Sequence, residues 1–197
     1  MTKVVFDIIR HGEKNSDCLT PRGVEQVKAS ALKNLSGPYT QALFSGLNRA
    51  RQTVEICLAS IGHPEIPLRV EVGFSYVTAS QEAEKWVGQP IADLKEEGYR
   101  DGQNVEFWLK NWAPALVIRG QILATMRLRA QMAIGTAKSE RRILVGSHGP
   151  TAEAGCLDPA NTAALREADI IRYTWEVDPE EATPPLLVSS IVLRAPY

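Results

Sequence analysis

The sequence predicts an α/β layered fold, because strand-like and helix-like segments alternate along its first third. The near-continuous apolar run of residues 4–9 is typical of a strand that is covered on both faces of a sheet. A helix is expected from Pro21, with Thr20 as its N-cap and apolar residues at helical spacing up to Leu35. A short strand over residues 42–44 and a second amphipathic helix continue the alternation.

Composition and charge limit the classes of protein to consider. With 197 residues, 44% hydrophobic and 23% charged, the chain is expected to form one ordinary globular domain with a full core. The net charge of -1 gives no electrostatic reason to expect binding to nucleic acid or to an anionic membrane, and no apolar stretch reaches the length of a membrane span. The three cysteines show no metal-binding spacing, so reduced thiols in the cytoplasm are expected.

The middle of the chain, about residues 72–138, is expected to form a helical cap within a single domain that spans residues 1–197. Aromatic residues cluster there among charged ones, and glycine and proline interrupt the pattern. The remaining expected elements are helices near 90–98, 104–112, 114–137 and 159–168, and strands near 142–147, 170–177 and 186–194.

Two histidines and two arginines fall where expected strands end or an expected helix begins. Arg10 and His11 follow the first strand, His148 follows the strand near 142–147, and Arg49 lies near the start of the second helix. Ligands bind at the carboxyl ends of strands in open α/β sheets, so these side chains are expected to meet at one edge. Guanidinium groups match the oxygens of a transferring phosphoryl group, and a neutral imidazole is a competent nucleophile. The set therefore predicts phosphoryl transfer.

Four segments in order resemble the motifs of the histidine phosphatase superfamily, the phosphoglycerate-mutase-like group with an RHG signature (branch 1). They are residues 8–13 (IIRHGE), 19–23 (LTPRG), 44–53 (FSGLNRARQT) and 145–149 (VGSHG). The resemblance implies a three-layer α/β/α sandwich with a mixed, mostly parallel sheet and a small helical insertion. It also implies an enzyme that needs neither a metal nor an organic cofactor.

Carried over to matching positions, the resemblance implies that His11 is the phosphorylated nucleophile. It implies that Arg10, Arg49 and His148 bind the phosphate group, with His148 also counted as catalytic. The expected function is a phosphatase that hydrolyses a phosphomonoester through a phosphohistidine on His11. A mutase-like phosphotransferase and a non-catalytic phospho-ligand binding protein are the alternatives.

The family also uses a glutamate to protonate the leaving group, and the resemblance places it at Glu71. The glycine–tryptophan–glutamate pattern that usually follows is not present, so Glu82 and Glu84 are alternatives. The acid branch of the superfamily carries an aspartate directly after the late histidine, and Gly149 at that position disfavours this branch.

The expected substrate is a small phosphate ester, with a phosphoprotein as the alternative, and neither nucleic acid nor a membrane is expected as a partner. Lys14 directly after the RHGE segment and the short loop to Leu19 argue against assuming mutase activity. The sequence leaves open which ester is the substrate, whether the enzyme is a phosphatase or a mutase, and which oligomeric state it adopts.

Overall fold

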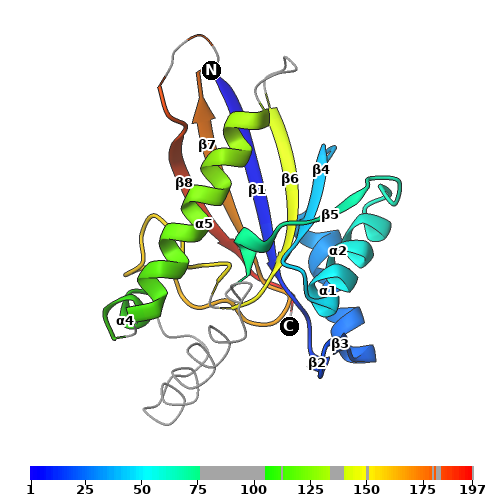
Figure 1. Cartoon of the computed structure of the whole chain (residues 1–197). Helices are drawn as coiled ribbons and strands as arrows, with labels where there is room; N and C mark the ends of the chain where they lie inside the picture. Colours follow the sequence, from blue (N-terminus) through cyan, green and yellow to red (C-terminus); the bar gives the residue numbers. More distant parts are fainter. Residues whose placement is uncertain are drawn as a thin grey trace.

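The computed structural model describes residues 1–75, 105–111, 113–133, 140–149, 151–178, 180 and 183–196. Figure 1 shows its helices and strands in chain order. They are β1 (Thr2–Arg10), β2 (Lys14–Asn15), β3 (Cys18–Leu19), α1 (Pro21–Asn34), β4 (Gln41–Phe44), α2 (Asn48–Ser60), β5 (Leu68–Val70), the 3-10 helix η1 (Val72–Phe74), α4 (Val105–Asn111), α5 (Ala113–Met132), β6 (Glu140–Ser147), β7 (Ile170–Val177) and β8 (Leu186–Leu193).

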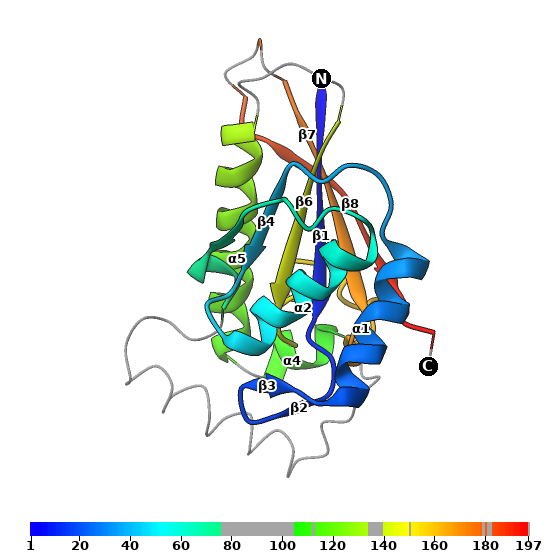
Figure 2. The ribbon, with the colours of Figure 1, turned by 90° about the vertical axis from the view of Figure 1, so that its right-hand side faces the viewer.

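Six strands form one mixed sheet in the order β5-β4-β6-β1-β7-β8. The first four of these are parallel, whereas β7 pairs antiparallel with β1, and β8 pairs antiparallel with β7. Helices α1 and α2 lie on one side of the sheet and α5 on the other (Figures 1 and 2). This arrangement confirms the predicted three-layer sandwich with a mostly parallel sheet.

Both faces of β1 are buried, as its apolar sequence predicts. Phe6 and Ile8 belong to a buried cluster with Ile122 of α5, whereas Ile9 belongs to a second cluster with Val27 of α1. A fully buried side chain of this size contributes about 1.5–3 kcal/mol relative to an exposed one. Burial on both sides therefore fixes the strand whose end carries the candidate nucleophile.

Helix α1 begins as the sequence predicts. The Oγ1 of Thr20 accepts a hydrogen bond from the Gly23 N–H (3.1 Å), and Pro21 occupies the first turn. The loop after β1 lies directly on this turn, and a Cβ at Gly12 would lie 2.4 Å from the Gly23 carbonyl oxygen. Only glycine permits this approach, so Gly12 places the end of β1 against α1.

Helix α5 forms one layer of the sandwich instead of standing apart from the sheet, because its buried residues pack on the sheet face. The predicted helices near 104–112 and 114–137 correspond to α4 and α5. The predicted helix near 90–98 lies outside the described residues, and the predicted cap with its boundaries stays a prediction. None of the described helices is both long and apolar enough to cross a membrane.

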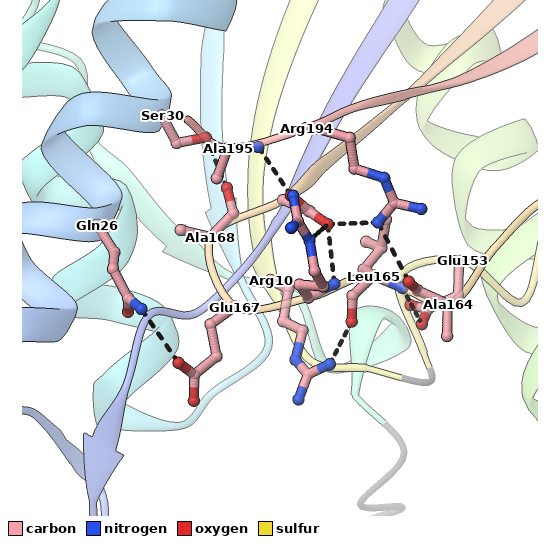
Figure 3. Close-up of polar contacts among 12 residues, drawn as sticks. Arg10, Gln26, Ser30, Glu153, Ala164, Leu165, Glu167, Ala168, Arg194 and Ala195 are labelled. Carbon is pink, nitrogen blue, oxygen red and sulfur yellow. Dashed lines mark hydrogen bonds and ion pairs between the residues drawn. The ribbon is translucent and has the colours of Figure 1, made fainter. Parts of the chain in front are cut away.

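The prediction of a helix near 159–168 is wrong, because this segment forms turns and irregular backbone. Distant side chains donate hydrogen bonds to three carbonyl groups of this segment (Figure 3). The Leu165 carbonyl accepts from Arg10, the Ala164 carbonyl from Arg194 (3.2 Å), and the Ala168 carbonyl from Ser30 (2.6 Å). These long-range bonds hold the segment in its irregular conformation.

Candidate active site

Three neighbouring strands bring the candidate side chains to one edge of the sheet, the lower edge in Figure 1. Strand β1 ends at Arg10 and leads into His11, whose backbone N–H donates to the Ser147 carbonyl at the end of β6 (3.2 Å). Strand β6 leads directly into His148. On its other side β4 leads into Ser45, whose N–H also donates to a β6 carbonyl (3.1 Å). The predicted convergence of strand ends is therefore present.

The two histidines are buried and adjacent, with ring centroids 5.3 Å apart and planes tilted by 58°. The Nδ1 of His11 is 2.8 Å from the Gly12 carbonyl oxygen. Because a carbonyl oxygen only accepts, Nδ1 carries the hydrogen of the neutral ring and Nε2 holds the lone pair. The Nε2 of His148 lies 2.6 Å from the Ser45 hydroxyl, which fixes the orientation of this second ring.

The surroundings keep both imidazoles neutral. Burial, the largest cause, and the positive charges of Arg49, Arg10 and Lys14 lower the pKa of His11 to about 4, against an opposing backbone hydrogen bond. Burial and the neighbouring His11 and Arg49 lower the pKa of His148 well below its ordinary value. At neutral pH, His11 therefore has its lone pair available for attack on an electrophile.

We expect His11 to make the fold less stable as the pH falls from 7 to 5. The unfolded chain binds a proton at an ordinary pKa of about 6.5, whereas the folded chain holds this ring neutral down to its pKa of about 4. The folded state is therefore not penalised by the low pKa of His11 above pH 6.5, and it loses stability relative to the unfolded chain as the pH falls below this value. The expected loss is about 2 kcal/mol between pH 7 and pH 5.

Urea unfolding of the wild type and of His11→Gln at the two pH values measures this effect. The variant should lose less unfolding free energy on acidification, by the stated amount. His63→Gln, in a partly exposed turn, is the control and should follow the wild type. Equal losses in the wild type and in His11→Gln would contradict the prediction.

Arg49 is held at the start of α2 by an acidic residue of the β2–β3 hairpin. The Asp17 Oδ1 accepts from the Arg49 Nη1 (2.9 Å), and its Oδ2 accepts from the Asn48 backbone N–H (3.0 Å). The Arg49 side chain is only 12% exposed, so this ion pair fixes a guanidinium that is largely withdrawn from water. The Asp17 carboxylate also caps α2, because the N-cap residue of this helix, Leu47, has no side chain that can accept a capping hydrogen bond.

Arg10 lies between two late segments of the chain. Its Nη1 donates to the Leu165 carbonyl, and its backbone N–H donates to the Asp169 carbonyl (3.0 Å). A Cβ at Gly149 would lie 3.1 Å from the Arg10 Nη1, so the glycine after His148 leaves room for the guanidinium. The RHG and SHG segments thus pack against each other through this arginine.

Glu71 is placed differently from the other predicted site residues. Its Oε1 accepts from the Gly73 N–H (3.3 Å), and its Oε2 accepts from the Nε of Arg129 on α5 (2.7 Å). Within the described part of the chain, it has no hydrogen bond or ion pair with either histidine or with Arg10. The structure therefore brings His11 and His148 together but does not join Glu71 to them. Glu82 and Glu84 lie outside the described residues.

Two residues of this edge, Ser45 and Asp17, are not predicted as site residues by the sequence. Ser45 lies within the segment 44–53 and directly follows the strand predicted over residues 42–44, so its position at a strand end indicates a place at this edge. Asp17 lies in the short loop after the RHG segment, and no local pattern connects it with Arg49, 32 positions later. Across the residues described, no cluster of three or more histidine, cysteine, aspartate or glutamate side chains is arranged to hold a metal ion.

Comparison with solved structures supports the fold. A mycobacterial glucosyl-3-phosphoglycerate phosphatase complexed with VO3 is 18% identical, with a TM-score of 0.55 over 95% of this chain and 97% of that chain. The phosphoglycerate mutase from Bacillus anthracis str. Sterne is 15% identical, with a TM-score of 0.53 over 95% and 92%. A phosphoserine phosphatase from Entamoeba histolytica, in complex with 3-phosphoglyceric acid, is 18% identical, with a TM-score of 0.52 over 96% of both chains.

A search of curated proteins finds no match. The sequence profile of the histidine phosphatase superfamily (branch 1), in contrast, matches residues 7–164, which include both histidines and both arginines of the candidate site. This match covers most of the chain and agrees with the architecture. The chain belongs to the histidine phosphatase superfamily, branch 1.

Proposed function

We propose that this chain is a metal-independent phosphatase that hydrolyses a phosphomonoester through a phosphohistidine on His11. The observation that carries this proposal is the buried, neutral His11, whose Nε2 lone pair lies on an edge shared with His148 and two arginines. In the first step Nε2 attacks phosphorus, and the bond between phosphorus and the ester oxygen breaks. Arg10, Arg49 and His148 bind the equatorial oxygens, on which negative charge is spread.

The departing alkoxide takes a proton from a carboxylic acid and leaves as an alcohol. In the second step water attacks the phosphohistidine, the P–N bond breaks, and the same carboxylate receives the proton of the water. Inorganic phosphate and neutral His11 result, so the site returns to its starting state. No other reactant is required.

For the proton donor we propose Glu71, with Glu82 and Glu84 as alternatives. In the structure the two oxygens of Glu71 accept hydrogen bonds from the Gly73 N–H and from Arg129, and the positive charge of Arg129 opposes the protonation that donation by Glu71 needs. Comparison of Glu71→Gln, Glu82→Gln and Glu84→Gln separates the three. Loss of the donor should lower kcat/KM, which reports the first step, by about 100-fold for an alkyl phosphate and have little effect on kcat/KM for 4-nitrophenyl phosphate, whose leaving group needs no proton.

The proposed substrate is a small phosphate ester. The glucosyl-3-phosphoglycerate phosphatase, the phosphoserine phosphatase and the phosphoglycerate mutase, which share the fold, all carry such esters in their names. A phosphoprotein is the alternative substrate, and a mutase reaction would use the same nucleophile. The proposed compartment is the cytoplasm, where the three cysteines, which form no disulfide, would remain reduced.

A phospho-ligand binding protein without turnover is the second candidate. The specific observation in its favour is that the first-choice donor, Glu71, is engaged in an ion pair with Arg129. In that case the phosphate-binding groups would remain and the leaving group would not be protonated.

Phosphate release from 4-nitrophenyl phosphate in the presence of EDTA tests the proposal. Turnover that persists without metal is the expected result. Product analysis with 3-phosphoglycerate then separates the classes: free phosphate indicates a phosphatase, and an isomerised ester indicates a mutase. Binding of inorganic phosphate without turnover of any ester would favour the binding protein and contradict the proposal.

A further inference from the structure

Glu153 is a fully buried carboxyl group close to the proposed phosphate site. It lies in the turn that follows His148, and its Oε1 accepts a hydrogen bond from the Leu165 N–H (3.0 Å). Its Oε2 is also buried and has no hydrogen-bond partner among the residues that the structure describes. A buried carboxyl group with one unpaired oxygen is costly, so this position points to a role beyond packing.

Glu153 and Arg10 both form hydrogen bonds with the backbone of the same residue, Leu165. Glu153 accepts from the N–H of Leu165, and the carbonyl of Leu165 accepts from the Nη1 of Arg10 (Figure 3). The backbone of Arg10 is bound to the same segment as its side chain, since the Arg10 N–H donates to the carbonyl of Asp169, four residues after Leu165 (3.0 Å). Glu153 therefore acts on the guanidinium through one intervening residue.

The groups that face Glu153 come from four parts of the chain. Arg10 is the last residue of β1 and Arg194 directly follows β8, and the positive charges of both favour the carboxylate form of Glu153. Tyr173 of β7 and Cys156, three residues after Glu153, also interact with it. Burial outweighs the two positive charges and raises the pKa of Glu153 to about 7. Both protonation states are therefore accessible at neutral pH.

We propose that Glu153 is a positioning residue for Arg10 and takes up a proton from solvent when a phosphate group binds to that arginine. The hydrogen bond at Oε1 can form in both states, because the proton can reside on the unpaired Oε2. The negative charge of a bound phosphate group offsets the positive charge of Arg10, so Arg10 stabilises the Glu153 carboxylate less. Protonation removes the resulting negative charge, so phosphate binding and proton uptake favour each other.

This inference rests on the proposed function only in taking Arg10 as a phosphate ligand, and its test needs no turnover. Calorimetric titration of inorganic phosphate at pH 7, in two buffers with different ionisation enthalpies, counts the protons taken up per phosphate bound. Protons that phosphate itself gains or loses are the same in the wild type and in Glu153→Gln. We expect the wild type to take up about half a proton more than this variant, since a group with a pKa of about 7 is half ionised there.

Two further variants separate positioning from charge. Glu153→Ala removes the acceptor for Leu165 and should bind phosphate about tenfold more weakly at pH 6, whereas Glu153→Gln, which keeps an oxygen at this place, should bind within about twofold of the wild type. Glu167→Gln removes a carboxylate from the same segment, one that pairs with Gln26, and should match the wild type in affinity and proton count.

Equal proton counts in the wild type and Glu153→Gln, or wild-type affinity in Glu153→Ala, would overturn the inference while leaving the proposed function intact. A wild-type protein that binds no phosphate would overturn both. If Glu153→Ala does not fold, as judged by circular dichroism, the proton count of Glu153→Gln decides alone.

Discussion

Replacing His11 with alanine is expected to lower kcat/KM for an aryl phosphate by about 10,000-fold or more. The change removes the atom that would form the covalent bond to phosphorus and leaves the arginines in place. Their electrostatic stabilisation alone accounts for the residual rate that enzymes retain after loss of a nucleophile. Steady-state phosphate release from 4-nitrophenyl phosphate measures the change.

A phosphoryl label separates loss of the nucleophile from loss of the fold. Wild-type protein that is quenched in alkali during turnover of a labelled ester should retain the label on histidine, and His11→Ala should retain none. The thermal unfolding of the variant should remain cooperative, and His63→Ala, whose ring pairs with Glu65 in a turn, should keep full activity. Retained turnover or label in His11→Ala would rule out the phosphohistidine mechanism.

Replacing Asp7 with alanine is expected to cost about 3 kcal/mol of unfolding free energy. Asp7 is fully buried in the central strand and accepts from the Nε of Arg172 (2.6 Å) and the hydroxyl of Tyr39 (2.7 Å). Its removal leaves a half-buried guanidinium and a buried hydroxyl without their acceptor. That loss exceeds the effect of most single substitutions.

Urea denaturation with an unchanged m value measures this loss. The matched control is Tyr39→Phe, which removes one hydrogen bond from the same network and should cost about 1 kcal/mol. A loss for Asp7→Ala no larger than that of the control would show that the ion pair with Arg172 adds nothing to stability.

The sequence predicts the layers and the candidate edge because both depend on local patterns. The apolar run before Arg10 predicts β1, and the segment 170–177 coincides with β7 as observed. Strand ends then place His11 and His148 at one edge without any knowledge of their contacts. The spacing of apolar residues and the position of strand ends are sufficient for this level of description.

Contacts between distant segments account for what the sequence does not predict. The expected helix near 159–168 does not form, and the side chains that bind the carbonyl groups of this segment, those of Arg10, Arg194 and Ser30, are all distant in sequence. The ion pair of Glu71 with Arg129 joins positions 58 residues apart. Composition and periodicity carry no information on such pairs.

The position of β1 in the sheet also bears on how the chain folds during synthesis. Both neighbours of this first strand come late, since Lys3 pairs with Glu140 of β6 and with Glu176 of β7. The ribosome therefore releases an apolar strand, two helices and β4 well before either partner of β1 exists. High contact order of this kind slows folding and prolongs the time for which a strand such as β1 remains unpaired.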